Sequence, residues 1–153
     1  MKYWLLKSEA EVFSLNDLKN SPGQTTYWDG VRNYQARNFI RDEMKLGDKA
    51  LFYHSNSEPN LIAGICKIVK EAYPDFTAFD PDNEHYDPKS KKENPAWFMV
   101  DVKWEEEFKN PVTLQSVKLN PKLKNMRLVQ PGNRLSVMPV TKDEFEEILK
   151  MSG

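Results

Sequence analysis

Apolar and polar positions along the chain form patterns that predict both strands and helices. Residues 3–8 and 49–54 are aromatic and aliphatic runs without Gly or Pro, which is typical of strands. Residues 61–72 begin with a nearly continuous apolar run, which predicts a strand buried on both faces. Residues 97–107 and 134–140 place apolar side chains at every second position. These five segments therefore predict the body of a sheet.

Two capping boxes predict helices near the two ends of the chain. Ser14 is followed three residues later by Asp17, which predicts a short helix ending near residue 20. Thr141 is followed in the same way by Glu144, and this pair predicts the start of a C-terminal helix.

A third helix is expected in the first half of the chain. Asn33 is a suitable N-cap, and the helix is expected to run to about Lys45. Its buried stripe recurs at helical spacing: Ala36, Phe39, Ile40 and Met44. Residues 111–128 predict a short strand followed by helical turns, which Pro121 interrupts.

The order of these elements predicts the fold class. Strands interrupted by short helices, without a regular strand–helix–strand repeat, favour an α+β domain with a mostly antiparallel sheet, curled into a β-barrel and flanked by short helices. Residues 73–95 are the longest irregular segment and contain four prolines. A connection of that length is usually functional or mobile, and its aromatic residues predict that it packs against the domain.

Composition narrows the class of protein. The chain has 153 residues, of which 39% are hydrophobic and 12% aromatic, and a single cysteine, Cys66. We expect one globular domain spanning residues 1–153, without a disulfide. No signal peptide or membrane span is apparent. The expected protein is a monomer in a reducing compartment, cytoplasmic in a bacterium or nuclear in a eukaryote.

Charge is distributed unevenly, although the net charge is only −1. That small value argues against a broadly cationic surface for nucleic acid. Residues 108–142, however, contain no Asp or Glu. A nucleic-acid contact should therefore be local and should use this stretch, whose basic residues are Lys109, Lys118, Lys122, Lys124, Arg127, Arg134 and Lys142. The simpler interpretation, for any one lysine, is a solvated surface.

The richest chemistry lies in residues 28–38, which combine an indole, a carboxylate, guanidinium groups, amides and a phenol. Gly30 indicates a tight turn, and Trp28 beside it is the best tryptophan for a pocket wall. On the following helix, Arg37 and Arg41 share a face suited to anions. These side chains are suited to binding a flat polar ligand. A helix start with a solvated arginine face explains the same residues equally well.

Two further segments place polar groups near strand ends. Tyr53, His54, Ser55 and Asn56 end a strand and enter a loop, where His54 is either a ligand-binding group or a satisfied polar residue. Lys7 and Ser8 are adjacent on a strand and so should point to opposite faces, which disfavours a catalytic Ser–Lys pair. Either side chain could still serve a pocket.

No metal or cofactor site is expected. The acids of residues 80–87 resemble a calcium loop, but the glycine and glutamate that such a loop requires are replaced by His85 and Lys91. No spacing of Cys or His typical of a zinc site is present.

Residues 28–38, WDGVRNYQARN, resemble the signature of the EVE domain family. Further segments resemble the same family in the same order: residues 4–9, 52–56, 73–75, 86–90 and 134–137. The departures are Ala10, Met138 and the loop 58–61, which differ from the usual family residues and lie at the expected rim of the site.

The resemblance implies a PUA-like fold and kinship with domains that bind modified bases, such as the YTH domain. It implies a protein that binds nucleic acid, either DNA or RNA, and recognises a modified base. That base is expected to be a modified cytosine in DNA, extruded from the strand into a pocket. The expected base-binding residues are Lys7, Ser8, Trp28, Asp29, Gly30, Val31, Arg32, Asn33, Tyr53, His54, Ser55, Asn56, Arg134, Leu135, Ser136 and Val137. The expected phosphate contacts are Arg37, Arg41, Lys122, Lys124 and Arg127.

Two alternatives remain open from the residues themselves. One is a metal-independent enzyme acting on a nucleotide or modified base, with His54 and Asp29 as acid–base groups. The other is a module that holds a small anionic metabolite. The sequence contains no convincing catalytic constellation, so a non-enzymatic reader is the leading hypothesis.

Overall fold

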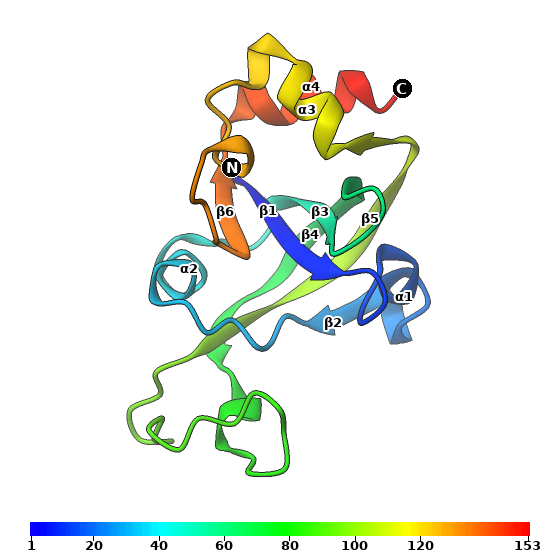
Figure 1. Ribbon diagram of the computed structural model, residues 1–153. Helices are drawn as coiled ribbons and strands as arrows, with labels where there is room; N and C mark the ends of the chain where they lie inside the picture. Colours follow the sequence, from blue (N-terminus) through cyan, green and yellow to red (C-terminus); the bar gives the residue numbers. More distant parts are fainter.

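A six-stranded sheet forms the centre of the computed structural model, which describes all residues 1–153 (Figure 1). Its strands are β1 (Tyr3–Glu9), β2 (Thr25–Tyr27), β3 (Lys49–Ser55), β4 (Leu61–Pro74), β5 (Phe98–Thr113) and β6 (Val137–Val140). They lie in the order β2-β5-β4-β3-β1-β6. All neighbours are antiparallel except β1 and β3, which run parallel, so the predicted α+β class with a mostly antiparallel sheet is confirmed.

The strand order is linear, with β2 and β6 at its two ends. These end strands are not paired with each other, so the hydrogen bonds do not close the sheet into the expected barrel. The barrel therefore stays a prediction.

Four helices border the sheet: α1 (Leu15–Lys19), α2 (Tyr34–Asn38), α3 (Leu114–Leu119) and α4 (Lys142–Met151). Both predicted capping boxes are present: Ser14 and Asp17 exchange hydrogen bonds at α1, and Thr141 and Glu144 do so at α4. Because each pair satisfies two backbone donors that the helix leaves free, these helix starts could be read from the sequence.

The predicted helix 33–45 is more complex than its pattern. Asn33 caps α2 as expected by accepting from the Ala36 amide at 3.0 Å. The helix then continues as a π-helical turn, Phe39–Glu43. This turn ends two residues before Lys45, where the helix was expected to end. The wider turn alters the helical spacing, which the stripe pattern does not show.

One strand was missed, and two strand predictions need correction. Strand β2 has only three residues and was not predicted, since Thr-Thr-Tyr is too short for a clear alternation. The two strands expected at 97–107 and from Pro111 are the single strand β5. The prediction of a strand over 134–140 was wrong for its first three residues, because β6 begins at Val137.

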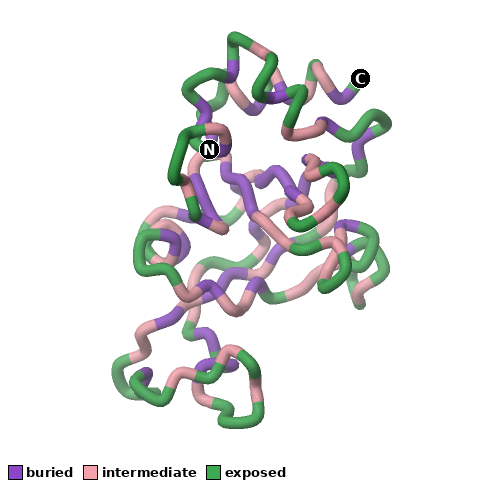
Figure 2. Tube along the Cα trace, viewed as in Figure 1, coloured by how far each residue is buried: buried purple, intermediate pink, exposed green.

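The core lies between the sheet and the helices. Trp4, Leu5, Leu6 and Phe52 on the two parallel strands are fully buried, and the strands form the buried centre of the trace in Figure 2. The indole N–H of Trp4 donates to the buried Asp48 carboxylate at 3.0 Å, so this polar group is satisfied inside the core. None of the helices has the length and apolar character needed to span a bilayer.

Residues 75–97, called here the lobe, extend from one end of β4 and β5 (green, Figure 1). The lobe is closed at its base where the Asp75 amide donates to the Trp97 carbonyl at 2.9 Å. Its acids stabilise turns: Asp80 accepts from the Asp82 amide, and Asp87 accepts from the Lys89 amide and the Trp97 indole. The indole bond leads the interactions that lower the pKa of Asp87. No group of three or more His, Cys, Asp or Glu side chains is arranged to hold a metal ion.

Candidate functional site

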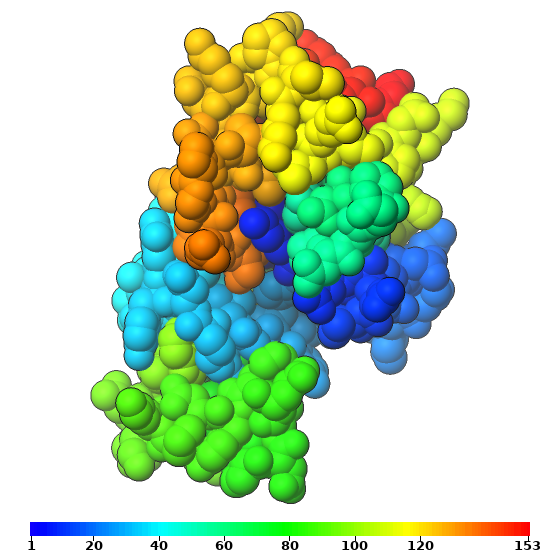
Figure 3. Space-filling model, viewed as in Figure 1, coloured from blue at the N-terminus to red at the C-terminus, as the bar shows by residue number.

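A pocket of about 410 Å³ lies where five parts of the chain meet on one face of the molecule (Figure 3). They are the end of β1, the turn that follows it, the stretch through β2 to residue 31, the lobe, and the loop before β6. The volume is within the range of small-molecule binding sites. The lining residues are Lys7, Ser8, Val12, Phe13, Thr26, Tyr27, Trp28, Asp29, Gly30, Val31, Glu84, His85 and Ser136.

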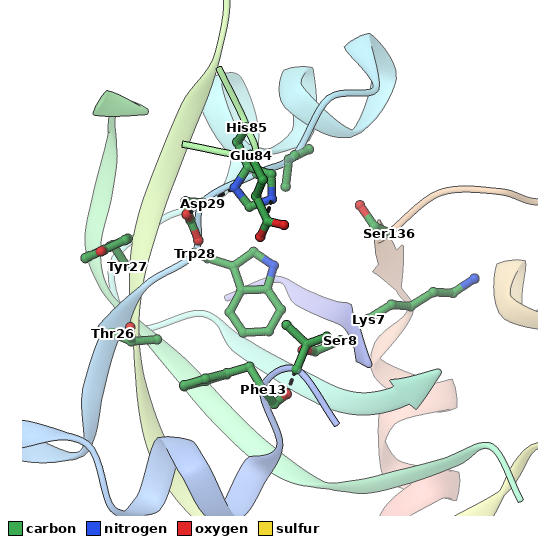
Figure 4. A pocket seen from close by; sticks show the side chains of 13 residues that line it. Lys7, Ser8, Phe13, Thr26, Tyr27, Trp28, Asp29, Glu84, His85 and Ser136 are labelled. Atoms are coloured by element: carbon green, nitrogen blue, oxygen red, sulfur yellow. Dashed lines mark hydrogen bonds and ion pairs between the residues drawn. The ribbon is translucent and has the colours of Figure 1, made fainter. Parts of the chain in front are cut away.

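Trp28 forms one wall of the pocket (Figure 4). Its amide donates to Val100 at 2.8 Å, which continues the pairing of β2 with β5. Its ring packs edge-on against Phe52, with centroids 5.5 Å apart, and at 6.5 Å against Phe13. The indole is therefore fixed by aromatic neighbours, and only 8% of the residue is exposed.

Asp29 and the lobe residues Glu84 and His85 form the polar side of the pocket. The Asp29 Oδ2 lies 3.4 Å from His85 Nδ1, and the Glu84 Oε1 lies 3.7 Å from His85 Nε2. His85 Nδ1 is buried and has no hydrogen-bond partner. Two carboxylates thus face an imidazole here, and this edge of the pocket presents mainly hydrogen-bond acceptors.

Gly30 and His85 are in contact at the base of this edge. Gly30 has a φ of +81°, and a Cβ built there would lie 2.6 Å from the His85 ring. Glycine is therefore required at position 30 for two reasons: the positive φ angle, and the lack of room for a Cβ beside the His85 ring. The Gly30 amide donates to Asp75 at 2.9 Å, which ties this turn to the lobe.

Arg32 lies behind the pocket and holds the lobe in place. Its guanidinium forms an ion pair with Asp75 at 2.9 Å and donates to the His85 carbonyl at 2.7 Å. Asp75 is fully buried. Burial opposes its ionisation, but hydrogen bonds from Thr77, Gly30 and Arg32 outweigh that effect and lower its pKa. Arg32 therefore has protein partners for most of its donors.

Lys7 is the one cation in the pocket lining. It lies 5.8 Å from the centre of the Tyr53 ring and has no carboxylate within ion-pair distance. Partial burial lowers the pKa of its ammonium group. Lys7 and Ser8 both line the pocket, although neighbours on a strand normally face opposite ways, because the pocket wraps around the end of β1.

The predicted segment 53–56 supports the site from outside its lining. His54 Nε2 accepts from the Leu15 amide at 3.1 Å, and burial lowers its pKa against the opposing charge of Asp17. Tyr53 is buried, and burial raises its pKa although the nearby Asn60 side chain opposes that shift. Asn56 donates to Glu9, and none of these residues nor Ser55 lines the pocket. His54 and Asp29 are thus not brought together as the enzyme hypothesis requires.

The other predicted residues divide between core and surface. Ser136 lines the pocket and its carbonyl accepts from the Lys7 amide at 2.9 Å, whereas Leu135 and Val137 are buried core residues. Asn33 is occupied as a helix cap, and Arg134 is exposed.

The predicted phosphate contacts lie outside the pocket, and most have protein partners. Arg37 donates to the Ala96 carbonyl at 2.7 Å. Arg41 binds Asp42 through two nitrogens, and Lys122 lies 4.0 Å from Glu147. Arg127 lies over the Phe39 ring, and Lys124 is exposed without an ion pair.

Six lining residues were not among those predicted: Val12, Phe13, Thr26, Tyr27, Glu84 and His85. Glu84 and His85 directly precede the family-like segment 86–90, which is the signal that could have indicated them. Val12 and Phe13 are apolar residues within a turn, and that unusual pairing is the only local sign of their position.

Known proteins resemble this chain in both sequence and structure. Residues 2–151 match the EVE domain family. The chain is 49% identical to human thymocyte nuclear protein 1 over 166 residues, covering 97% of this chain and 73% of that protein, and equally identical to the Gallus gallus protein, of which it covers 68%.

Two solved structures superpose closely. Human THYN1 protein in complex with 5-methylcytosine containing DNA gives a TM-score of 0.94 at 49% identity, with 99% of this chain and 98% of that chain covered. Protein PSPTO5229 from Pseudomonas syringae gives 0.94 at 48% identity, with 99% of both chains covered.

Proposed function

Because this chain belongs to the EVE domain family, we propose that it is a DNA-binding reader that accepts one modified cytosine in the pocket beside Trp28. The carrying observation is the pocket itself, which combines a fixed indole, a polar edge and one cation without a carboxylate partner. The similarity to human THYN1 in complex with 5-methylcytosine containing DNA supports the choice of ligand. The PUA-like barrel is part of the same proposal for the curled sheet.

The extruded base stacks on Trp28 in this proposal. Aromatic stacking contributes about 1–3 kcal/mol per base and needs a ring that is already fixed. The contacts of Trp28 with Phe52 and Phe13 supply that fixation. Val31 and Phe13 add apolar surface to the lining, which suits a methyl group on the base.

The acidic edge of the pocket selects cytosine. Cytosine presents an exocyclic amine, which a carboxylate can accept from, whereas thymine presents a carbonyl oxygen at the same position. Asp29 and Glu84 are the carboxylates of the lining, and Ser136 adds a hydroxyl group. We therefore expect the amine of the bound base to face Asp29.

Lys7 holds a phosphate next to the extruded nucleotide. A partly desolvated ammonium group without an ion-pair partner interacts strongly with an anion that enters its reach. Arg134, exposed on the neighbouring loop, extends this contact along the backbone. The arginines with protein partners, such as Arg41, contribute less.

A binding panel tests the proposal. Duplexes that carry 5-methylcytosine, 5-hydroxymethylcytosine, thymine or plain cytosine at one position are titrated with the protein and followed by fluorescence anisotropy. A modified cytosine should bind more tightly than its unmodified control, and Asp29→Asn should weaken discrimination against thymine. Lys45→Met, a change at an exposed lysine outside the pocket, is the control. Equal binding of all duplexes would refute the reader function.

A small anion is the second candidate ligand, favoured by the free ammonium group of Lys7. Competition distinguishes the two: inorganic phosphate or a nucleoside monophosphate at moderate concentration should not displace the modified duplex. Complete displacement at equal ligand concentration would favour a metabolite module.

A further inference from the structure

An exposed valine lies at the mouth of the pocket. Val12 belongs to the turn between β1 and α1 and lines the pocket, yet 68% of its surface is exposed. A β-branched apolar side chain in water contributes little to folding, because it removes almost no apolar surface from solvent. Its position at the pocket suits a role in which a bound partner buries the side chain.

The turn that carries Val12 is held from several sides. The amides of Val12 and Phe13 both donate to the Glu9 carbonyl, at 3.0 and 2.9 Å. The Ser8 hydroxyl donates to the Phe13 carbonyl at 2.6 Å, and the adjoining helix start is fixed by the Leu15 amide on His54. The turn therefore holds the Val12 side chain in a defined position, which lowers the entropic cost of inserting it into a binding partner.

Extruding a base leaves a gap in the duplex stack. Proteins that open a duplex commonly fill such a gap with an apolar side chain, which offsets part of the unstacking energy. Resting on the proposed function, we propose that Val12 is the wedge that enters the stack at the place vacated by the modified base. Val12 is thus a positioning residue: it stabilises the open duplex instead of reading the base.

The other exposed apolar residues do not fit this role. Leu46 and Leu119 are exposed but lie outside the pocket lining. Tyr27 lines the pocket, but its ring already packs edge-on against Phe76 with centroids 4.9 Å apart. Tyr34 is stacked on Trp97, lies 4.9 Å from the Arg37 guanidinium and is not part of the pocket lining. Only Val12 combines a place at the mouth with a free apolar surface.

The test compares one modified oligonucleotide as a single strand and as a duplex. A wedge matters only where a stack must be opened. Val12→Ala should therefore weaken binding to the duplex about tenfold and leave single-strand binding unchanged. Val12→Ile keeps the wedge and should bind the duplex at least as well as the native protein. Leu46→Ala, at another exposed turn residue, is the matched control and should change neither affinity.

A mismatch opposite the modified base sharpens the test. The mismatched base is already easier to extrude, so the effect of Val12→Ala should shrink on that duplex. Equal losses on single strand and duplex would make Val12 a wall of the pocket, and no loss on the duplex would remove any role; either result overturns the wedge. Failure of the proposed function is visible separately, as a native protein that does not prefer the modified strand.

Discussion

Lys7 at the mouth of the pocket and Arg32 at its joint with the lobe are both partly buried cations, but only Arg32 has partners inside the protein. Arg32 is bonded to Asp75 and to the His85 carbonyl. Lys7 has no carboxylate partner and faces the pocket. The same type of charge thus stabilises the fold in one region and remains available to a ligand in the other.

The difference teaches how to assign a cation to folding or to binding. A charge whose donors are already satisfied loses native contacts when it binds a ligand, whereas an unsatisfied, half-buried charge gains on binding. Burial alone does not separate the two residues. The decisive quantity is the number of donors with protein partners.

The largest expected effect is on stability, from Arg32→Met. The change leaves the fully buried Asp75 without its ion-pair partner. Breaking a buried pair on one side costs about 3–5 kcal/mol, and the lower value is expected because Arg32 is partly exposed. Urea unfolding at neutral pH measures the loss.

The double variant Arg32→Met with Asp75→Asn controls for that result, since it removes the uncompensated charge and should recover part of the stability. A fully stable Arg32→Met protein that has lost DNA binding would instead assign Arg32 to the ligand.

The second effect is on binding, from Lys7→Met. Removing the proposed charge-assisted phosphate contact should weaken DNA binding by about tenfold or more. Stability should stay equal or rise, because the burial that lowers the pKa of Lys7 disfavours its charged form in the folded protein. Anisotropy titration and urea unfolding of the same preparation measure both quantities. A destabilised Lys7→Met protein would contradict the comparison.

A third effect is the loss of stability in acid. The pKa of Asp75 is lower in the folded protein than in the unfolded chain. Its carboxylate therefore stabilises the fold above the unfolded value of about 4, and this contribution disappears as the pH falls through the lower folded pKa. The free energy of unfolding, measured by urea from neutral pH down through that window, should fall more steeply for the native protein than for Asp75→Asn. If the free energy of unfolding fell equally with pH in both proteins, Asp75 would not be the source of the acid sensitivity.

The smallest effect concerns the outer arginines. Arg134 is exposed and has no ion pair, whereas Arg41 is neutralised by two bonds to Asp42. Arg134→Gln should lower the slope of log affinity against log salt by about one, and Arg41→Gln should lower it less. Titrations at several salt concentrations give the slopes. A larger change for Arg41→Gln would show that Asp42 releases it to phosphate.

The sequence predicts those parts of the fold that local chemistry determines. The caps at Ser14, Asn33 and Thr141 were all correct, because each depends on a side chain within three residues of the helix start. Strand β2 could not be predicted, because three residues pair with β5 only through contacts far along the chain. The π-helical turn after Asn38 likewise has no local signature.

The candidate site was predictable where it follows a continuous segment. The residues from Trp28 to Val31 line the pocket, as do Lys7, Ser8 and Ser136. His85 was beyond reach, because its place beside Gly30 depends on the lobe folding back across more than fifty residues of chain, through Asp75 and Arg32. Nor could residue type show that the donors of Arg32 and the acceptor of His54 would be used internally.

The contact of Gly30 with His85 has a consequence for altering the proposed base preference by protein engineering. A side chain at position 30 would need both a disfavoured backbone angle and a displaced imidazole, so a variant library there would yield misfolded pockets instead of new preferences. Positions 84 and 85 lie on the lobe and touch the same edge of the pocket. Randomising these two while keeping glycine at 30 should change which base is accepted and leave the sheet intact.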